Sequence, residues 1–250
     1  GMVINMDVSL IIPVYNESKI ILNTIRTASK KLAELTSSYE ILIVDDGSTD
    51  GTAALVENCR DSHVFLIHYA PNHGKGMAVR TGMLTAKGNI IICTDADLAY
   101  GVDVFGRILG RFATTDTDIV AGTRSDRADA YQNYPPLRRF ISKGFRLVVQ
   151  LFSRLNYDTQ CGIKGFRKQA AQVVYRRCTI NGFSFDIEVL MWADRLGLKV
   201  NCLPVSVVNF RESKIHVIRD SCRMLFDLFR IRWRVRKKPN AEDRLERSMP

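Results

Sequence analysis

The residues of this chain best suited to chemistry are two aspartates at the end of an apolar run. Asp95 and Asp97 follow Ile90–Cys93, a run typical of a buried strand. In an extended segment residues i and i+2 point to the same side, so both carboxylates can address one ligand. Two close carboxylates repel each other unless a cation lies between them, and a divalent ion that bridges a diphosphate is the usual partner. The alternative is that both side chains only cap a loop.

Two further strand ends carry polar side chains that suit a nucleotide. The apolar run Val8–Pro13 precedes Tyr15, which could stack on a base, and Glu17, which could accept a hydrogen bond from an exocyclic donor. The run Glu40–Val44 precedes Asp46, and an acidic residue there suits hydrogen bonds to a ribose or a base edge. These residues also have an ordinary explanation, because Asp-Gly pairs form turns and Ser, Thr or Asp cap helices.

The elements that position these residues alternate along the first half of the chain. We expect strands at Val8–Pro13, Glu40–Val44, Val64–His68, Asn89–Thr94 and Asp118–Ala121. We expect helices between them at Ser18–Leu35, Thr52–Cys59, Gly76–Ala86 and Val104–Phe112, and later ones at Leu137–Leu155, Lys168–Arg177 and Phe185–Leu196, before a strand at Val200–Val205. This order predicts an α/β fold with a mostly parallel sheet that helices flank on both faces. No Gly-x-Gly-x-x-Gly follows the first strand, which argues against a dinucleotide-binding fold.

The charge of the chain indicates an anionic partner. Its 250 residues carry a formal net charge of +10, and 46% of them are hydrophobic, enough for a full core. Nucleic acid, an anionic membrane or a phosphorylated substrate would fit this charge. No nucleic-acid motif is present, so we do not expect nucleic acid as a partner. The six cysteines form no Cys-x-x-Cys pair, so neither a zinc site nor a redox motif is supported.

The C-terminal part differs from the rest in its pattern. We expect one domain over residues 7–215, a basic amphipathic helix over 216–238 and a polar tail over 239–250. A basic amphipathic helix with aromatic residues can lie in a membrane interface, but it can equally pack on the sheet with a solvated basic face. No apolar run reaches the length of a transmembrane helix and no signal peptide precedes Val8. With the scattered cysteines, which indicate reduced thiols, these features predict a cytoplasmic protein.

Six strings of the sequence together resemble a known family. They are Ser9–Glu17, Val44–Thr52, Asn72–Gly76, Thr94–Asp97, Asp158–Lys164 and Phe183–Glu188. The chain resembles family 2 glycosyltransferases of the GT-A fold, a Rossmann-like fold. Within that family it is similar to polyprenyl-phosphate sugar synthases, first to dolichyl-phosphate β-glucosyltransferases and more distantly to dolichyl-phosphate mannose synthases.

This resemblance implies roles for the residues already singled out. It implies a nucleotide pocket formed by Pro13, Tyr15, Glu17 and Asp46. Asp97, with Asp95, would hold Mg²⁺ or Mn²⁺ on the diphosphate, and Asp95 would also contact the ribose or the sugar. Lys75 would support either the diphosphate or only its loop. The acceptor in the family is a lipid phosphate, and its candidate ligands are Arg124, Arg138, Arg139, Ser142 and Lys214. A lipid acceptor also favours the membrane-interface reading of the C-terminal helix, so the resemblance implies a protein that is peripheral on the inner face of the cell membrane. Asp158 would orient an arginine or act as a base.

The resemblance also implies a reaction, with alternatives that the sequence leaves open. The expected enzyme inverts the anomeric centre and moves one sugar from UDP-glucose, or from GDP-mannose or another donor, to a polyprenyl phosphate. A non-lipid glycan acceptor, or a binding protein without catalysis, are the competing readings. Ala99 stands where mannose synthases carry a glutamine that binds the metal, so metal coordination is expected to be looser. Phe229 stands where processive synthases have the Gln of Gln-x-x-Arg-Trp, which favours single transfer.

Overall fold

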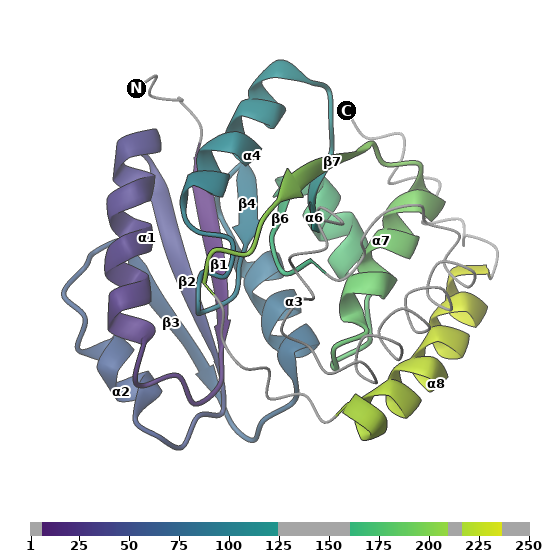
Figure 1. The fold of residues 1–250 in the computed structure, drawn as a ribbon, viewed down its shortest axis with the longest axis horizontal. Coiled ribbons are helices and arrows are strands. Elements are labelled where there is room, and N and C mark those ends of the chain that lie inside the picture. Colours follow the sequence, from purple (N-terminus) through teal and green to yellow (C-terminus); the bar gives the residue numbers. More distant parts are fainter. Residues whose placement is uncertain (1–6, 125–160, 210–216, 237–250) are drawn as a thin grey trace.

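The computed structural model describes residues 7–124, 161–209 and 217–236, with side chains in the last stretch from 226 to 235. The described strands form one seven-stranded sheet in the order β3-β2-β1-β4-β6-β5-β7 (Figure 1). They are β1 (Val8–Val14), β2 (Tyr39–Asp46), β3 (Val64–Tyr69), β4 (Ile90–Cys93), β5 (Ile119–Arg124), β6 (Lys164–Arg167) and β7 (Val200–Val205). Only β6 runs antiparallel to its neighbours, which confirms the expected mostly parallel sheet.

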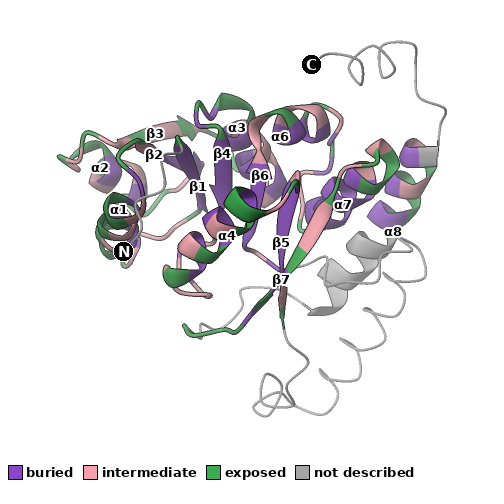
Figure 2. Ribbon diagram, turned by 90° about the horizontal axis from the view of Figure 1, so that it is seen from above, coloured by how far each residue is buried: buried purple, intermediate pink, exposed green. Residues whose placement is uncertain are grey.

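Helices cover both faces of this sheet. The described ones are α1 (Ile21–Leu35), α2 (Thr52–Glu57), α3 (Lys75–Thr85), α4 (Asp103–Thr114), α6 (Lys168–Tyr175), α7 (Phe185–Leu196) and α8 (Val217–Arg236). Side chains of α1, α2 and α4 share one core with one face of the sheet, and those of α3, α6, α7 and α8 share the other. Along β1, Leu10 and Ile12 enter the first core while Ile11 enters the second, so the central strands are buried throughout (Figure 2).

The sequence did not predict β6. This strand is the run Lys-Gly-Phe-Arg, which has a glycine and two charged residues in four positions and does not look like a central strand. It is buried nevertheless, because it lies between β4 and β5 and its Lys164 side chain has a carboxylate partner. The other strands and helices lie within a few residues of their expected bounds. The helix expected at 137–155 lies outside the described residues.

The described part of α8 has two different faces. Leu228, Ile231 and Val235 are buried in the core that they share with α7. Phe226 and Trp233 are each 64% exposed, and Phe229 is 60% exposed. The helix therefore packs on the domain, as one of the two expectations had it, and still presents aromatic side chains to solvent. No helix in the described ranges combines the length and apolarity needed to cross a bilayer.

A buried glutamate of α7 fixes the segment that supports the start of α3. Glu188 is fully buried, and its Oε2 accepts hydrogen bonds from the backbone N–H groups of Thr179 at 2.9 Å and Ile180 at 2.8 Å. The carbonyl of the next residue, Asn181, accepts the N–H of Gly76 at 2.7 Å. A β-carbon on Gly76 would lie 2.4 Å from the Ile180 carbonyl oxygen, so only glycine allows this close approach.

We expect Glu188→Ala to lower the free energy of unfolding by about 3 kcal/mol, because it leaves two backbone N–H groups without their acceptor. Urea unfolding of the parent and the variant measures this difference. Glu57→Ala, at an exposed position on α2, is the control and should change the value by less than about 0.5 kcal/mol. Equal stabilities of the Glu188 and Glu57 variants would contradict the assigned role of Glu188.

Candidate active site

Parallel pairing brings the acidic strand ends to one edge of the sheet. β1 lies between β2 and β4, with Val14 opposite Asp45 and Ile11 opposite Cys93. The residues that follow these strands therefore meet at the carboxyl edge, where ligands bind in open α/β sheets. Tyr15 is 44% exposed there. Pro13 is buried inside β1, next to Val44.

Asp46 shapes the loop in front of α3. Its carboxylate is buried, with Oδ2 accepting hydrogen bonds from Asn72 Nδ2 at 2.8 Å and Gly74 N at 2.7 Å, and Oδ1 accepting one from His73 N at 2.8 Å. A carboxylate has about four acceptor positions, so this loop occupies most of them. The nucleotide contact assigned to Asp46 stays a prediction, whereas its hydrogen bonds to the loop at residues 72–74 are observed.

Asp45, which was not among the predicted site residues, joins the loops after β1 and β2. It is fully buried and accepts hydrogen bonds from Ser48 N at 3.0 Å, from Ser48 Oγ at 2.5 Å and from His68 Nδ1 at 3.2 Å. Ser48 Oγ in turn accepts the backbone N–H of Asn16 at 2.8 Å. This chain of contacts fixes the segment between β1 and α1, which carries Tyr15 and Glu17.

Lys75 and Asp95 form an ion pair in the middle of this edge. Lys75 Nζ lies 2.5 Å from Asp95 Oδ1, and the two side chains are 27% and 31% exposed. Burial alone would raise the pKa of Asp95, but the Lys75 ammonium outweighs it, with help from Lys164 and Arg124, and the pKa lies below its ordinary value. Lys75 therefore contacts the acidic turn directly, whichever role it has toward a diphosphate.

A glycine permits the position of the Asp95 carboxylate. A β-carbon at Gly162 would lie 2.1 Å from Asp95 Oδ2, so the string Asp-Thr-Gln-Cys-Gly ends in the only residue that fits there. This string and the acidic turn are thus in contact, although they are more than 60 residues apart in the sequence.

A second ion pair, which sequence reasoning missed, lies beneath the first. Lys164 Nζ lies 2.6 Å from Asp186 Oδ1, and the side chains are only 3% and 11% exposed. Lys164 Nζ also donates to the Cys161 carbonyl at 2.5 Å. Burial raises the pKa of Asp186, although Lys164 and Lys75 oppose that effect. Both residues stand in strings that carry the family resemblance, which was the one available signal.

The two pairs form a network of alternating charge that we call the buried charge network: Lys75, Asp95, Lys164 and Asp186. Each carboxylate of the network interacts electrostatically with both lysines. Cys93 lies against the network, and burial raises the pKa of its thiol to about 12, so it is uncharged at neutral pH. The network gives the site a fixed pattern of charge before any ligand enters.

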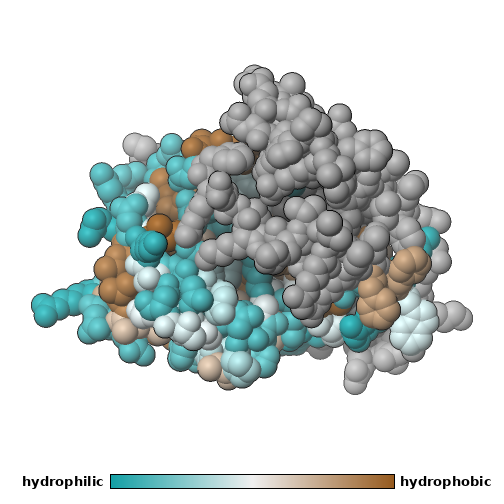
Figure 3. All heavy atoms as spheres, turned by 60° about the horizontal axis from the view of Figure 1, so that its bottom comes forward, coloured by the Kyte–Doolittle hydropathy of each residue, from teal (hydrophilic) through white to brown (hydrophobic). Residues whose placement is uncertain are grey.

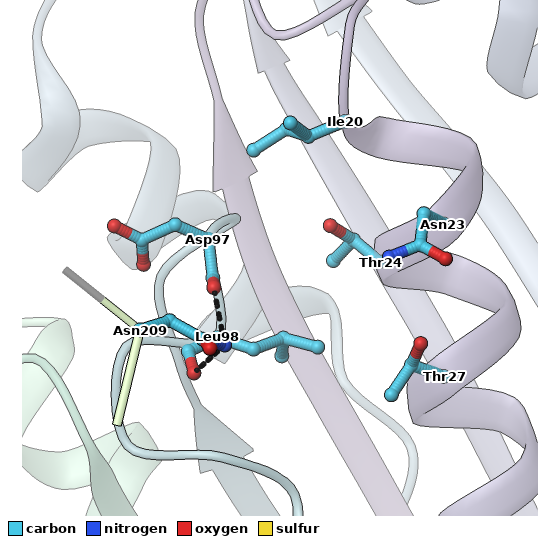
Figure 4. Close-up of a pocket in the computed structure, with 7 residues that line it drawn as sticks. All are labelled: Ile20, Asn23, Thr24, Thr27, Asp97, Leu98 and Asn209. Atoms are coloured by element: carbon cyan, nitrogen blue, oxygen red, sulfur yellow. Dashed lines mark hydrogen bonds between the residues drawn. The ribbon is translucent and has the colours of Figure 1, made fainter. Parts of the chain in front are cut away.

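Asp97 lies on the turn after Asp95, beside a pocket of about 280 Å³. This pocket is lined by Ile20, Asn23, Thr24, Thr27, Asp97, Leu98 and Asn209 (Figure 4). The Asp97 carboxylate points away from the α1 side chains in Figure 4, and its Oδ1 accepts the N–H of Ala99 at 3.1 Å. Arg124 ends β5 near enough to lower the pKa of Asp95.

The side chains at this edge suit a divalent cation that a substrate helps to hold. The described residues contain no group of three or more His, Cys, Asp or Glu side chains arranged for a metal ion. Mg²⁺ in phosphate sites is usually bound through one or two carboxylates plus substrate oxygens and water. The hard oxygen donors of Asp97 and Asp95 fit that mode.

The remaining predicted site residues lie outside the described part of the chain. They are Arg138, Arg139, Ser142, Asp158 and Lys214. Their roles stay predictions. Among the described residues, the structure brings Tyr15, Glu17, Asp46, Lys75, Asp95, Asp97 and Arg124 to the carboxyl edge of the sheet.

We expect Lys75→Met to raise the pKa of Asp95, because burial then acts with less opposition. The lowered pKa of Asp95 in the parent stabilises the fold above its ordinary value of 3.8, and this contribution is lost as the pH falls through the folded-state pKa. In the variant that loss moves to higher pH. Carboxyl ¹³C NMR titration measures the change. Lys31→Met, which breaks the surface pair of Lys31 with Asp103, should leave Asp95 unchanged; equal titrations of Asp95 in the parent and Lys75→Met would contradict the assigned pairing.

Known proteins share both the sequence and the fold. Residues 9–175 match the family described as Glycosyl transferase family 2. The dolichyl-phosphate beta-glucosyltransferase of Dictyostelium discoideum is 34% identical over 247 residues, which cover 92% of this chain and 75% of the relative. The enzyme of the same name from Saccharomyces cerevisiae is 32% identical over 245 residues, with 90% and 73% covered.

Solved structures show the same architecture at lower identity. The glucosyl-3-phosphoglycerate synthase of Mycobacterium tuberculosis, in complex with Mn²⁺, UDP-glucose and phosphoglyceric acid, has a TM-score of 0.67 at 17% identity, over 94% of this chain and 81% of that one. At this identity the likeness concerns the fold, and it confirms the GT-A architecture. With the family match across the acidic strand ends and β6, and relatives that align with nearly all of its length, the chain belongs to glycosyl transferase family 2.

Proposed function

We propose that this protein transfers one glucose from UDP-glucose to dolichyl phosphate or another polyprenyl phosphate, with inversion at the anomeric carbon. The observation that carries the proposal is the similarity, over 92% of the chain, to a dolichyl-phosphate beta-glucosyltransferase. The geometry of the carboxyl edge supports it, because the candidate nucleotide ligands Tyr15, Glu17 and Asp46 lie at the same edge as the acidic turn and the cationic side chains of Lys75 and Arg124.

The donor would bind across the ends of β1, β2 and β4. Tyr15 offers a ring for the base, while Glu17 and Asp46 offer acceptors for its N–H groups. Lys75 and Arg124 place positive charge beside the diphosphate. Asp97, with Asp95 next to it, would hold Mg²⁺ or Mn²⁺, which stabilises charge that builds on the leaving nucleoside diphosphate.

The acceptor phosphate needs positioning more than activation. Its second pKa is near 6, so it is largely a dianion at pH 7 and already nucleophilic. Its oxygen forms a bond to the anomeric carbon while the bond from that carbon to the diphosphate breaks, and the electron pair leaves with the nucleoside diphosphate. One arginine side chain can bind two phosphate oxygens at once, so Arg124 and Arg138 suit this role. Lys214 would add positive charge beside the phosphate. Asp158 would orient one of these arginines.

The test is release of nucleoside diphosphate from a panel of UDP- and GDP-sugars, with Mn²⁺ or Mg²⁺, with and without polyprenyl phosphate in detergent. We expect lipid-dependent release from UDP-glucose, reduced by at least about 100-fold in Asp97→Ala. Asn23→Ala, in the same pocket but on the α1 side, is the control and should keep full activity. Release from GDP-mannose and not from UDP-glucose would contradict the proposed donor. Release that only soluble glycans stimulate would contradict the proposed lipid acceptor.

We further propose that the protein works at the inner face of the cell membrane and that α8 contacts the lipid surface. Phe226, Phe229 and Trp233 recur at helical spacing, and Arg230 on the same helix is exposed. Figure 3 shows hydrophobic side chains exposed on the side where α8 lies in Figure 1. Aromatic rings suit the boundary between lipid and water, and each basic residue near an anionic leaflet contributes about 1 kcal/mol.

We expect the double substitution Phe226→Ser and Phe229→Ser to reduce sedimentation with anionic vesicles by about tenfold or more, because two rings no longer enter the interface. Phe65→Ser is the control, since Phe65 is 47% exposed but lies on β3. Circular dichroism of each variant checks that the fold is kept. Equal sedimentation of all three proteins would show that α8 does not contact the membrane.

A further inference from the structure

The turn that carries Asp97 contains a strained residue. Leu98 has φ of +49°, in the left-handed region that a leucine rarely adopts, and its side chain is 5% exposed. Within the turn, Leu98 N donates to the Asp95 carbonyl at 3.0 Å and Gly101 N donates to the Leu98 carbonyl at 2.8 Å. Backbone strain of this kind persists only where the surrounding structure holds it, so the contacts that do so are informative.

Side chains from two distant segments hold the turn from outside. From α1, Thr24 Oγ1 donates to the Ala96 carbonyl at 2.6 Å. From the segment after β7, Asn209 Nδ2 donates to the carbonyls of Asp97 at 3.2 Å and Leu98 at 3.0 Å (Figure 4). Three consecutive carbonyls thus accept hydrogen bonds from residues that are remote in the sequence.

The backbone of the same segment adds two further bonds. The N–H groups of Val208 and Asn209 both donate to the Ala99 carbonyl, at 2.8 Å and 3.2 Å. The segment 208–209 therefore runs along the turn, and the Asn209 side-chain amide binds the peptide groups on either side of the Leu98 α-carbon. A primary amide has two N–H donors, which is what bonds to two successive carbonyls require.

We propose that Asn209 is a positioning residue that fixes the orientation of Asp97 for a divalent cation. The inference rests on the proposed function, in which Asp97 is the metal ligand. The bond to the Asp97 carbonyl restrains ψ of Asp97, and the bond to the Leu98 carbonyl restrains the left-handed backbone of Leu98. With the Thr24 bond to the Ala96 carbonyl, these contacts hold the main chain from which the Asp97 carboxylate projects. Residues behind a metal ligand commonly change metal affinity by 10- to 100-fold when they are replaced.

A folding role and a positioning role of this contact give different results when Asn209 is replaced. Asn209 is exposed, and the carbonyls that it binds lie at a pocket where water could replace it. A contact that only stabilised the fold would change the unfolding temperature and nucleotide binding together with metal affinity. A positioning role predicts a change in metal affinity by itself.

The experiment uses Asn209→Ala and Asn209→Asp in the full chain, with Asn23→Ala and Asn23→Asp as matched controls. Asn23 lines the same pocket from α1, so its variants make the same truncation and the same charge change without removing a donor to the turn. Free Mn²⁺, followed by electron paramagnetic resonance in the presence of UDP, gives the dissociation constant of the metal. Metal-free UDP binding and thermal unfolding are measured in parallel.

We expect both Asn209 variants to weaken Mn²⁺ binding by roughly 10-fold or more, with unfolding temperature and metal-free UDP binding unchanged. The Asn23 variants should bind Mn²⁺ like the parent. Unchanged Mn²⁺ affinity in the Asn209 variants, or a parallel loss of UDP binding and stability, would overturn the proposal. The variant Asp97→Ala distinguishes the metal role of Asp97 from the positioning role of Asn209. If Asp97→Ala also binds Mn²⁺ like the parent, the metal role of Asp97 is refuted as well. If Asp97→Ala binds Mn²⁺ more weakly while the Asn209 variants bind it like the parent, only the positioning role is refuted.

Discussion

The burial of carboxylates at one edge of the sheet is the constraint on which this site depends. Parallel strands deliver Asp45, Asp46, Asp95 and Asp97 to the same edge, and a carboxylate that is wholly or partly removed from water is unfavourable without compensation. The structure compensates three of them in different ways: a hydroxyl and an imidazole for Asp45, backbone N–H groups for Asp46, and an ammonium for Asp95. These donors lie on loops, strands and helices that are separate in the sequence, so the contacts that compensate the carboxylates also bring the segments of the site together.

The position of the site could be predicted from the sequence, but its internal contacts could not. Apolar runs that end in acidic residues identify strand ends. Parallel pairing then places those ends at one edge of the sheet, independently of the loop conformations. The three donors to Asp46 are different, because they require the loop at residues 72–74 to fold back over β2. Such a contact depends on tertiary structure, and no local pattern near Asp46 indicates it.

The burial of strand β6 and of the ion pair between Lys164 and Asp186 could likewise not be predicted from the local sequence. A lysine in a short polar run normally indicates a surface, and here the lysine is 2% exposed. Its burial is possible only because Asp186, on a helix that begins 18 residues after the strand ends, supplies the opposite charge. Removing one partner of such a pair leaves an uncompensated charge in the core, so strand and helix depend on each other.

That dependence has a consequence for how the protein can be divided. The family match ends at residue 175, before α7 begins, although it includes every described residue of the acidic edge. A fragment cut there would keep Lys164 but lose its counter-ion, and would keep Gly76 but lose the Asn181 carbonyl that receives its N–H. It would also leave β5 without its outer neighbour β7. The segment that matches the family and the smallest unit that can fold are therefore different lengths of chain, and the second extends at least through β7.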